Sequence, residues 1–149
     1  METSQIMVGD LVRYFNPDDN NEHICKVDTV FSNGRVLLFE YGSVNNDNEI
    51  DTYACKLEPI PITRGFLKLN GFEPVDLDSM LWAKRDGEYG ILYGFHEFTP
   101  DATITFYDVI NKKYACPECK YVHELQHLMR MAKLYDISSP SEMKIKKHA

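Results

Sequence analysis

Apolar and polar residues alternate through the first sixty positions, and short polar segments interrupt the pattern. Alternation with a period of two, bounded by turn residues, is typical of short antiparallel strands. In residues 23–31, HICKVDTVF, it places Cys25, Val27, Thr29 and Phe31 on one face of a predicted strand. We therefore expect this face to contact a hydrophobic core.

Three further segments fit the strand pattern: residues 6–15 (IMVGDLVRYF), 35–43 (RVLLFEYGS) and 50–57 (IDTYACKL), the last with Tyr53, Cys55 and Leu57 on one face. Between the second and third strands, Asn33 and Gly34 predict a type I′ turn, because both residue types accept a positive φ. Four or five short strands with tight turns predict a small SH3-like β-barrel over residues 1–60.

A proline-rich joint follows this first group of strands. Pro59 and Pro61 favour extended backbone and cannot donate to a central strand ladder. Thr63 is suited to cap a short helix over residues 64–70, and Gly71 is suited to end it. The joint therefore predicts a boundary near residue 60, with a new unit after it.

The second unit again contains strand signals and then a helix. Asp86 and Gly87 form a hairpin signal, and residues 102–109, ATITFYDV, read as a strand. Apolar residues with helical spacing predict a helix over about residues 120–135. The lysine-containing segment 138–149 is predicted to be a disordered tail.

These elements predict an α+β protein. A small SH3-like β-barrel is followed by a helix, an antiparallel sheet and a C-terminal amphipathic helix. The predicted boundaries are 1–60 for the barrel, 61–137 for the α+β unit and 138–149 for the basic tail.

Composition and charge narrow the function classes. The chain has 149 residues, 44% hydrophobic and 26% charged, which is ordinary for a globular protein. Its formal net charge of -7 makes nucleic-acid binding unfavourable, because an acidic surface repels phosphate. No apolar run is long enough to span a bilayer, and residues 1–10 do not resemble a signal peptide. We therefore expect a cytoplasmic protein whose four cysteines are thiols or metal ligands.

The stretch 116–127, CPECKYVHELQH, carries the most suggestive chemistry. On a helical wheel, the predicted core stripe comprises Tyr121, Val122, Leu125, Leu128, Met129, Ala132 and Tyr135. His123, His127 and Arg130 fall on the opposite side, where Cys119 joins them if the helix begins that early. The wheel therefore predicts that the two histidines face solvent, a partner or a metal ion.

One hypothesis is a zinc peptidase. His123, Glu124 and His127 match the HExxH spacing, in which two histidines hold zinc and the glutamate acts as general base. A third ligand is needed, and the candidates further along the chain are Asp136, Glu142 and His148. Only 22 residues follow His127, which leaves no sizeable subdomain to complete the usual cleft.

A second hypothesis is a structural zinc site formed by Cys116, Cys119 and His123, with or without His127, and completed if needed by Cys25 or Cys55. The usual second CxxC pair is absent from the sequence. If Cys119 is helical, it lies about 12 Å from His127, too far to share one ion. A redox role for the CxxC pair lacks the expected βαβ context.

The third interpretation is an amphipathic helix with a polar outer face. We favour it, and expect no metal site, no cofactor and no catalytic residue, with Glu124 as the catalytic candidate of the alternative.

Three stretches together carry a family resemblance: IMVGDLVRYF at the start, LEPIPITRGFLKLNGFE in the middle and KYVHELQHLMRMAKLY near the end. In this order they resemble a family of small uncharacterised proteins of Bacteroidetes genomes, prophages and phages, with a pattern of GD-V, then LEPIPLT and GF, then YVHxLQN. The chain departs from that pattern at His127, where asparagine is usual, and at CPEC, which the pattern does not require. The resemblance implies no activity, but it implies a fold that stands without a metal at these residues.

The expected function is therefore that of a non-enzymatic accessory protein, phage- or prophage-related, which binds a macromolecular partner that we expect to be a protein. The alternative is a zinc-binding protein or a zinc metallopeptidase centred on His123, Glu124 and His127.

Overall fold

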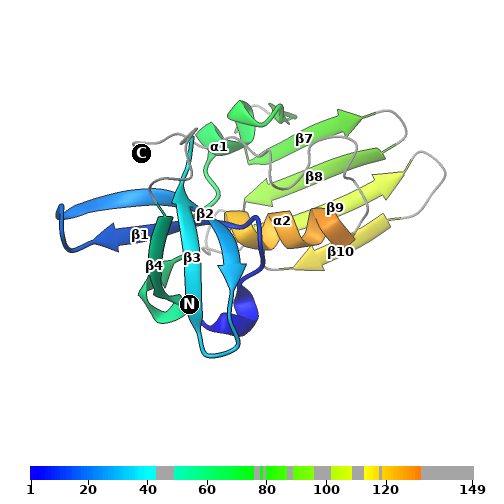
Figure 1. Ribbon diagram of the computed structural model, residues 1–149. Coiled ribbons are helices and arrows are strands. Elements are labelled where there is room, and N and C mark those ends of the chain that lie inside the picture. Colours follow the sequence, from blue (N-terminus) through cyan, green and yellow to red (C-terminus); the bar gives the residue numbers. More distant parts are fainter. Residues whose placement is uncertain are drawn as a thin grey trace. The chain divides into compact units, whose positions relative to one another are not determined.

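The protein is described from a computed structural model that covers residues 1–42, 49–75, 78, 80–86, 89–95, 102–108, 113–117 and 119–131 (Figure 1). It divides into two compact units, one comprising Met1–Ile60 and one beginning at Pro61. All strand pairs of the described residues are antiparallel, so the protein is a mixed α and β structure with antiparallel sheets. No helix in this part of the chain has both the length and the apolar character needed to cross a membrane.

The N-terminal unit is a five-stranded sheet with the order β4-β3-β2-β1-β5. Its strands are β1 (Leu11–Asn16), β2 (Asn21–Val30), β3 (Arg35–Glu40), β4 (Glu49–Tyr53) and β5 (Leu57–Glu58), with 3-10 helices at Thr3–Gln5 and Ala54–Lys56. In the described residues β4 and β5 form the two edges, so the sheet is open and the predicted closed barrel is wrong. The reason lies in β5, whose two residues pair only with Arg13 and Tyr14 of β1.

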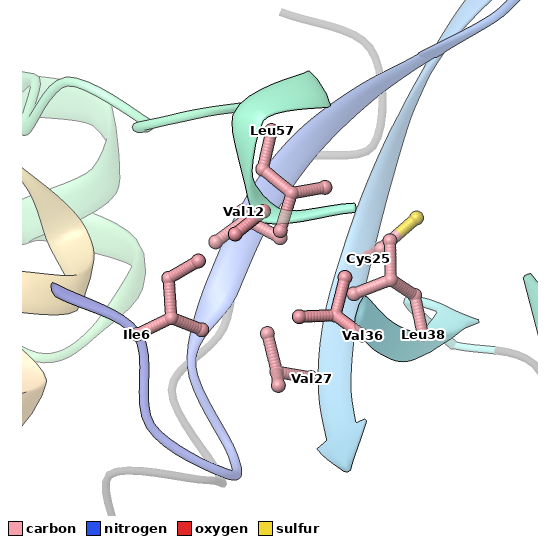
Figure 2. Close-up of a cluster of buried hydrophobic side chains, with 8 residues drawn as sticks. Ile6, Val12, Cys25, Val27, Val36, Leu38 and Leu57 are labelled. Carbon is pink, nitrogen blue, oxygen red and sulfur yellow. The ribbon is translucent and has the colours of Figure 1, made fainter. Parts of the chain in front are cut away.

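The core of this unit lies on one face of the sheet. Its buried residues are Ile6, Val12, Cys25, Val27, Val36, Leu38, Ala54 and Leu57, seven of which are labelled in Figure 2. They come from β1, β2, β3 and β5, with Ile6 before β1 and Ala54 in the 3-10 helix that precedes β5. Burial, and to a smaller extent Glu40, raises the pKa of the Cys25 thiol to about 12, so this thiol is neutral and inert at physiological pH.

A bulge changes the predicted face of β2. The register with β3 shifts between Val27 and Thr29, which inserts one extra residue into β2. Cys25 and Val27 are buried as predicted, whereas Thr29 is only half-buried and Phe31 is 36% exposed. The prediction of one continuous face from Cys25 to Phe31 is therefore wrong, because a bulge breaks the period of two.

The turn between β2 and β3 also differs from the expected type I′. The amide of Gly34 donates to the carbonyl oxygen of Phe31 at 3.1 Å, and the amide of Phe31 donates to Arg35 at 2.9 Å. Gly34 has a φ of 89°, but Asn33 is not among the residues with positive φ. The connection is thus a type I turn followed by a left-handed glycine, the usual three-residue hairpin loop.

The segment before β1 forms a tight turn instead of extending the strand. The amide of Asp10 donates to the carbonyl oxygen of Met7 at 3.1 Å, and Gly9 between them has a φ of 93°. The buried Asp10 carboxylate accepts from the amide of Met7 at 2.8 Å. The Gly-Asp pair therefore closes a turn, with glycine for its φ and aspartate as the acceptor.

The predicted strand 50–57 is divided. β4 ends at Tyr53, and the 3-10 helix Ala54–Lys56 turns the chain before β5. Tyr53 and Cys55 are exposed while Leu57 is buried, so the prediction that these three share one face is wrong. The prediction assumed a period of two residues, whereas the 3-10 helix at Ala54–Lys56 has three residues per turn.

The second unit contains another five-stranded antiparallel sheet with the order β10-β9-β8-β7-β6. Its elements are α1 (Arg64–Leu69), β6 (Glu73–Pro74), β7 (Leu81–Asp86), β8 (Tyr89–Phe95), β9 (Ala102–Asp108), β10 (Lys113–Pro117) and α2 (Val122–Met131). Asp86 pairs with Tyr89, which confirms the predicted hairpin between β7 and β8. The predicted tail 138–149 lies outside the described residues.

Helix α1 has the predicted cap and the predicted stop. The Thr63 hydroxyl accepts from the amide of Phe66 at 3.1 Å. At the other end, Gly71 has a φ of 85°, and the amide of Phe72 donates to the carbonyl oxygen of Leu67 at 2.9 Å. With Gly71 also donating to Lys68, this is a Schellman motif, and the buried side chains of Leu67 and Phe72 supply its apolar contact.

Two glycines of this region are predicted to respond oppositely to alanine. Gly71→Ala should lower the free energy of unfolding by about 1–2 kcal/mol, because alanine is strained at positive φ. Gly65→Ala should raise it by roughly 0.5–1 kcal/mol, because Gly65 is helical and a Cβ there would meet only an ordinary contact at 3.9 Å. Urea unfolding followed by fluorescence of Trp82, the single tryptophan, measures both changes. Equal effects of the two substitutions would contradict the assigned helix end.

Candidate functional site

The segment before helix α2 is held by backbone pairing with the proline-rich joint. The amide of Ile62 donates to the carbonyl oxygen of Lys120 at 2.9 Å, and Pro61 forms a β-bridge with Tyr121. The segment of Lys120 and Tyr121 is therefore paired as a strand would be, and it is not helical. The helix expected from about residue 120 begins at Val122, because pairing with the joint competes with the first helical turn.

A buried hydroxyl fixes the same segment from the sheet. The Tyr93 hydroxyl of β8 donates to the carbonyl oxygen of Cys119 at 2.6 Å, and both residues are buried. Burial is the main cause that raises the pKa of Tyr93 well above its usual value. The nearby Cys119 thiol and Glu124 carboxylate raise this pKa further. The hydroxyl is therefore a permanent donor. We call these contacts the clasp, formed by Pro61, Ile62, Tyr93, Cys119, Lys120 and Tyr121.

Glu124, the catalytic candidate, caps helix α2. Its Oε1 atom accepts from the amide of Lys120 at 3.2 Å and from the amide of Tyr121 at 3.1 Å. Glu124 is the third residue of the helix, the position from which a glutamate reaches back to the cap backbone. The same rule applied to the sequence could have identified this role.

The burial of α2 contradicts the helical wheel at two polar residues. Val122, Leu125 and Met129 are buried as predicted. His123 is also buried, with 6% of its surface exposed, and Gln126 is fully buried. The prediction that His123 faces outward is therefore wrong, since the enclosed surface of α2 is wider than its apolar stripe. His127 remains half-buried.

The two histidines and Tyr121 form a row of rings. The ring of His123 stacks on that of Tyr121, with centroids 6.0 Å apart and planes 15° apart. The rings of His123 and His127 lie 5.6 Å apart, edge to face. This spacing is what residues four apart on a helix give, and it accounts for the pair without a metal.

The four zinc candidates are only partly brought together. His123 and His127 are neighbours on α2, Cys119 is buried in the clasp, and Cys116 belongs to β10. Cys25 lies in the core of the N-terminal unit, and Cys55 is exposed in a 3-10 helix. Over the described part of the chain, no three His, Cys, Asp or Glu side chains form a group that could hold an ion. The downstream peptidase candidates Asp136, Glu142 and His148 lie outside the described residues.

Sequence reasoning missed two buried polar groups that shape this protein. Asp10 closes the turn before β1, and the Tyr93 hydroxyl anchors Cys119. The Gly-Asp pair is a recognisable turn signal. The partner of Tyr93 lies 26 positions away along the chain, so no local pattern could have indicated it.

Comparison with known protein families, with curated proteins and with solved structures found no match for this chain.

Glu124→Ala is predicted to lower the free energy of unfolding by about 1 kcal/mol, because two amides at the start of α2 lose their acceptor. Glu124→Gln keeps a carbonyl oxygen at this position and should cost clearly less. Urea unfolding followed by Trp82 fluorescence measures both variants. Glu73→Ala, an exposed glutamate of the same unit, is the control and should change stability by less than about 0.5 kcal/mol. An alanine effect no larger than that control would contradict the capping role.

Proposed function

We propose that this is a non-enzymatic accessory protein that binds a protein partner through its N-terminal unit. The observation that carries the proposal is the distribution of exposed apolar side chains. Five of the seven large ones in the described residues belong to that unit: Met7, Val8, Phe15, Phe31 and Tyr53. Exposed apolar side chains mark an interaction surface where they lie together, and this unit carries most of those in the described residues.

The chemistry of the HELQH stretch supports a non-enzymatic role. A peptidase of this type needs the glutamate to activate a metal-bound water. Here an oxygen of Glu124 accepts two backbone amides, and His123 is buried against Tyr121. These groups serve the fold of the second unit, which leaves the N-terminal unit as the better candidate for binding.

We further propose an open SH3-like arrangement for the N-terminal unit. In its support, the strands follow one another as a meander, and β5 returns to pair with β1. The 3-10 helix Ala54–Lys56 joins β4 to β5 within the described residues. Fold alone implies no function, so this likeness adds only that such small sheets present their faces and loops to partners.

A phage or prophage context is the remaining part of the proposal, and it rests on the sequence resemblance. Three of the motifs that carry this resemblance have structural roles. Gly9 and Asp10 close a turn, Ile62 pairs with Lys120, and Val122, Leu125 and Gln126 are fully buried on α2. Such roles support a shared fold among the similar proteins and carry no activity over.

The test of the proposed function is reconstitution with a purified partner. The chain is immobilised and used to capture proteins from a Bacteroidetes lysate at physiological salt, and each enriched protein is purified and titrated by calorimetry. We expect at least one purified protein to bind with a Kd below about 10 µM. The proposal fails if no purified candidate binds at that strength.

A zinc site remains the second candidate function, because His123 and His127 lie with ring centroids 5.6 Å apart on one side of α2. If the clasp holds the segment without metal, zinc in the untagged protein should be well below one per chain, and a chelator should leave the Tm unchanged. Elemental analysis and thermal melting measure these quantities. About one zinc per chain with a large loss of Tm on chelation would establish the metal site, since binding free energy would then contribute to folding. In that case Cys116→Ser distinguishes a structural site, which it would destabilise, from a peptidase site.

A further inference from the structure

The sheet of the N-terminal unit has a second face opposite its core. Val36 and Leu38 of β3 point into the core and are fully buried. Side chains alternate along a strand, so their neighbours on β3 and the residues paired with them on β4 occupy the other side. We call these residues the outer face: Arg35, Leu37, Phe39, Glu49, Asp51 and Tyr53.

The outer face has an apolar centre. A sheet with one face in water normally alternates apolar and polar residues. β3 instead carries Leu37 and Phe39 on this side, each half-buried, in addition to its two core residues. Across the strand pair, Tyr53 is 54% exposed beside Arg35. The face therefore keeps aromatic and aliphatic surface available for contact.

One residue of the outer face, Arg35, already places a guanidinium group between an aromatic ring and a carboxylate. The Arg35 guanidinium lies 5.0 Å from the centroid of the Phe31 ring. It also donates to both carboxylate oxygens of Asp51, from Nε at 2.8 Å and from Nη2 at 2.5 Å. An aromatic ring beside a carboxylate is the arrangement that favours arginine and lysine side chains. Glu49 adds an exposed carboxylate further along β4.

The charge of the chain is concentrated in the same unit. Residues 1–60 contain eleven acidic and four basic residues, a net charge of -7, whereas residues 61–149 contain twelve of each. The whole net charge of -7 therefore belongs to the first sixty residues. Their field attracts a cationic partner and repels nucleic acid or a second copy of the same acidic surface.

We infer that the outer face is the docking surface for a basic segment of a partner protein, one in which lysine or arginine residues flank apolar side chains. This inference rests on the proposed function and names its surface and the chemistry of its partner. The apolar side chains of the segment pack on Leu37, Phe39 and Tyr53, and its cationic groups lie against Glu49 and the negative field of the unit. The apolar centre supplies contact area, and the charge supplies selectivity and a fast encounter.

A peptide titration of the full chain tests this surface. The probe is the end-blocked peptide KRLFKRK, added to isotope-labelled protein while the backbone amide signals are followed by NMR. The peptide EELFEEE keeps the apolar residues and reverses the charges. We expect KRLFKRK to shift amides within residues 35–39 and 49–53 and to weaken several-fold when salt screens the charges. The acidic peptide should cause no shift. Binding of both peptides, no binding of KRLFKRK at about 1 mM, or shifts centred outside these residues would overturn the inference.

Two charge reversals separate the surface from the general acidity of the unit. Glu49→Lys lies on the outer face, and Asp18→Lys lies in the turn between β1 and β2 with the same change in net charge. We expect Glu49→Lys to weaken KRLFKRK about tenfold and Asp18→Lys no more than about twofold. Tyr53→Ala tests the apolar contribution without a change in charge and should also weaken binding. Equal effects of the two reversals would overturn the assignment of this face.

Two further outcomes distinguish the possible occupants. If the variant with Lys144, Lys146 and Lys147 changed to Gln shifts the outer-face amides without any peptide, the chain itself supplies the occupant and the inference is wrong. If a purified protein partner binds Glu49→Lys and Tyr53→Ala as tightly as the unchanged chain, the proposed function stands and only the docking surface is refuted.

Discussion

The second unit depends on the amide of Ile62 donating to the carbonyl oxygen of Lys120. This bond joins the proline-rich joint, which opens the unit, to the segment that leads into its last described helix. The neighbouring residues Pro61 and Tyr121 form an antiparallel bridge, to which Pro61 contributes no backbone donor because proline has no amide hydrogen. The Tyr93 hydroxyl then fixes Cys119 from the sheet. One short extended pairing thus ties together segments almost sixty positions apart.

The clasp and the capping of α2 give the residues of the metal-like stretch 116–127 structural roles. A helix leaves its first amides without internal partners, and Glu124 accepts two amides at the start of α2. His123 is buried and stacked on Tyr121, and His127 follows one turn later. A stretch that resembles a metal or protease motif therefore has a role in folding. Most of the exposed large apolar side chains of the described residues, and the net negative charge of the chain, belong to the first sixty residues.

Local signals in the sequence predicted the ends of α1 correctly. They did not predict strand faces and burial, which depend on bulges, tighter turns and contacts between distant residues. Thr63 and Gly71 bounded α1 as predicted, because capping depends on residues only a few positions apart. The bulge in β2 and the 3-10 helix after Tyr53 each shifted a predicted face, since one extra residue or a tighter turn reverses the alternation. The burial of His123 depends on what surrounds α2, which a helical wheel cannot contain. The sequence located the candidate site, and the capping rule could have identified the role of Glu124. The bond from Tyr93 to Cys119 could not be predicted, because the two residues lie 26 positions apart.

The central claim is that protein hydrogen bonds, without a metal ion, hold the clasp closed. Hydrogen exchange of the Ile62 amide, followed by NMR in metal-free protein and again with one equivalent of zinc, tests this most directly. The account predicts slow exchange in the metal-free protein and no change when zinc is added, because the amide is already bonded to Lys120. Fast exchange that becomes slow only with zinc would contradict it, and would show that the segment closes around a metal.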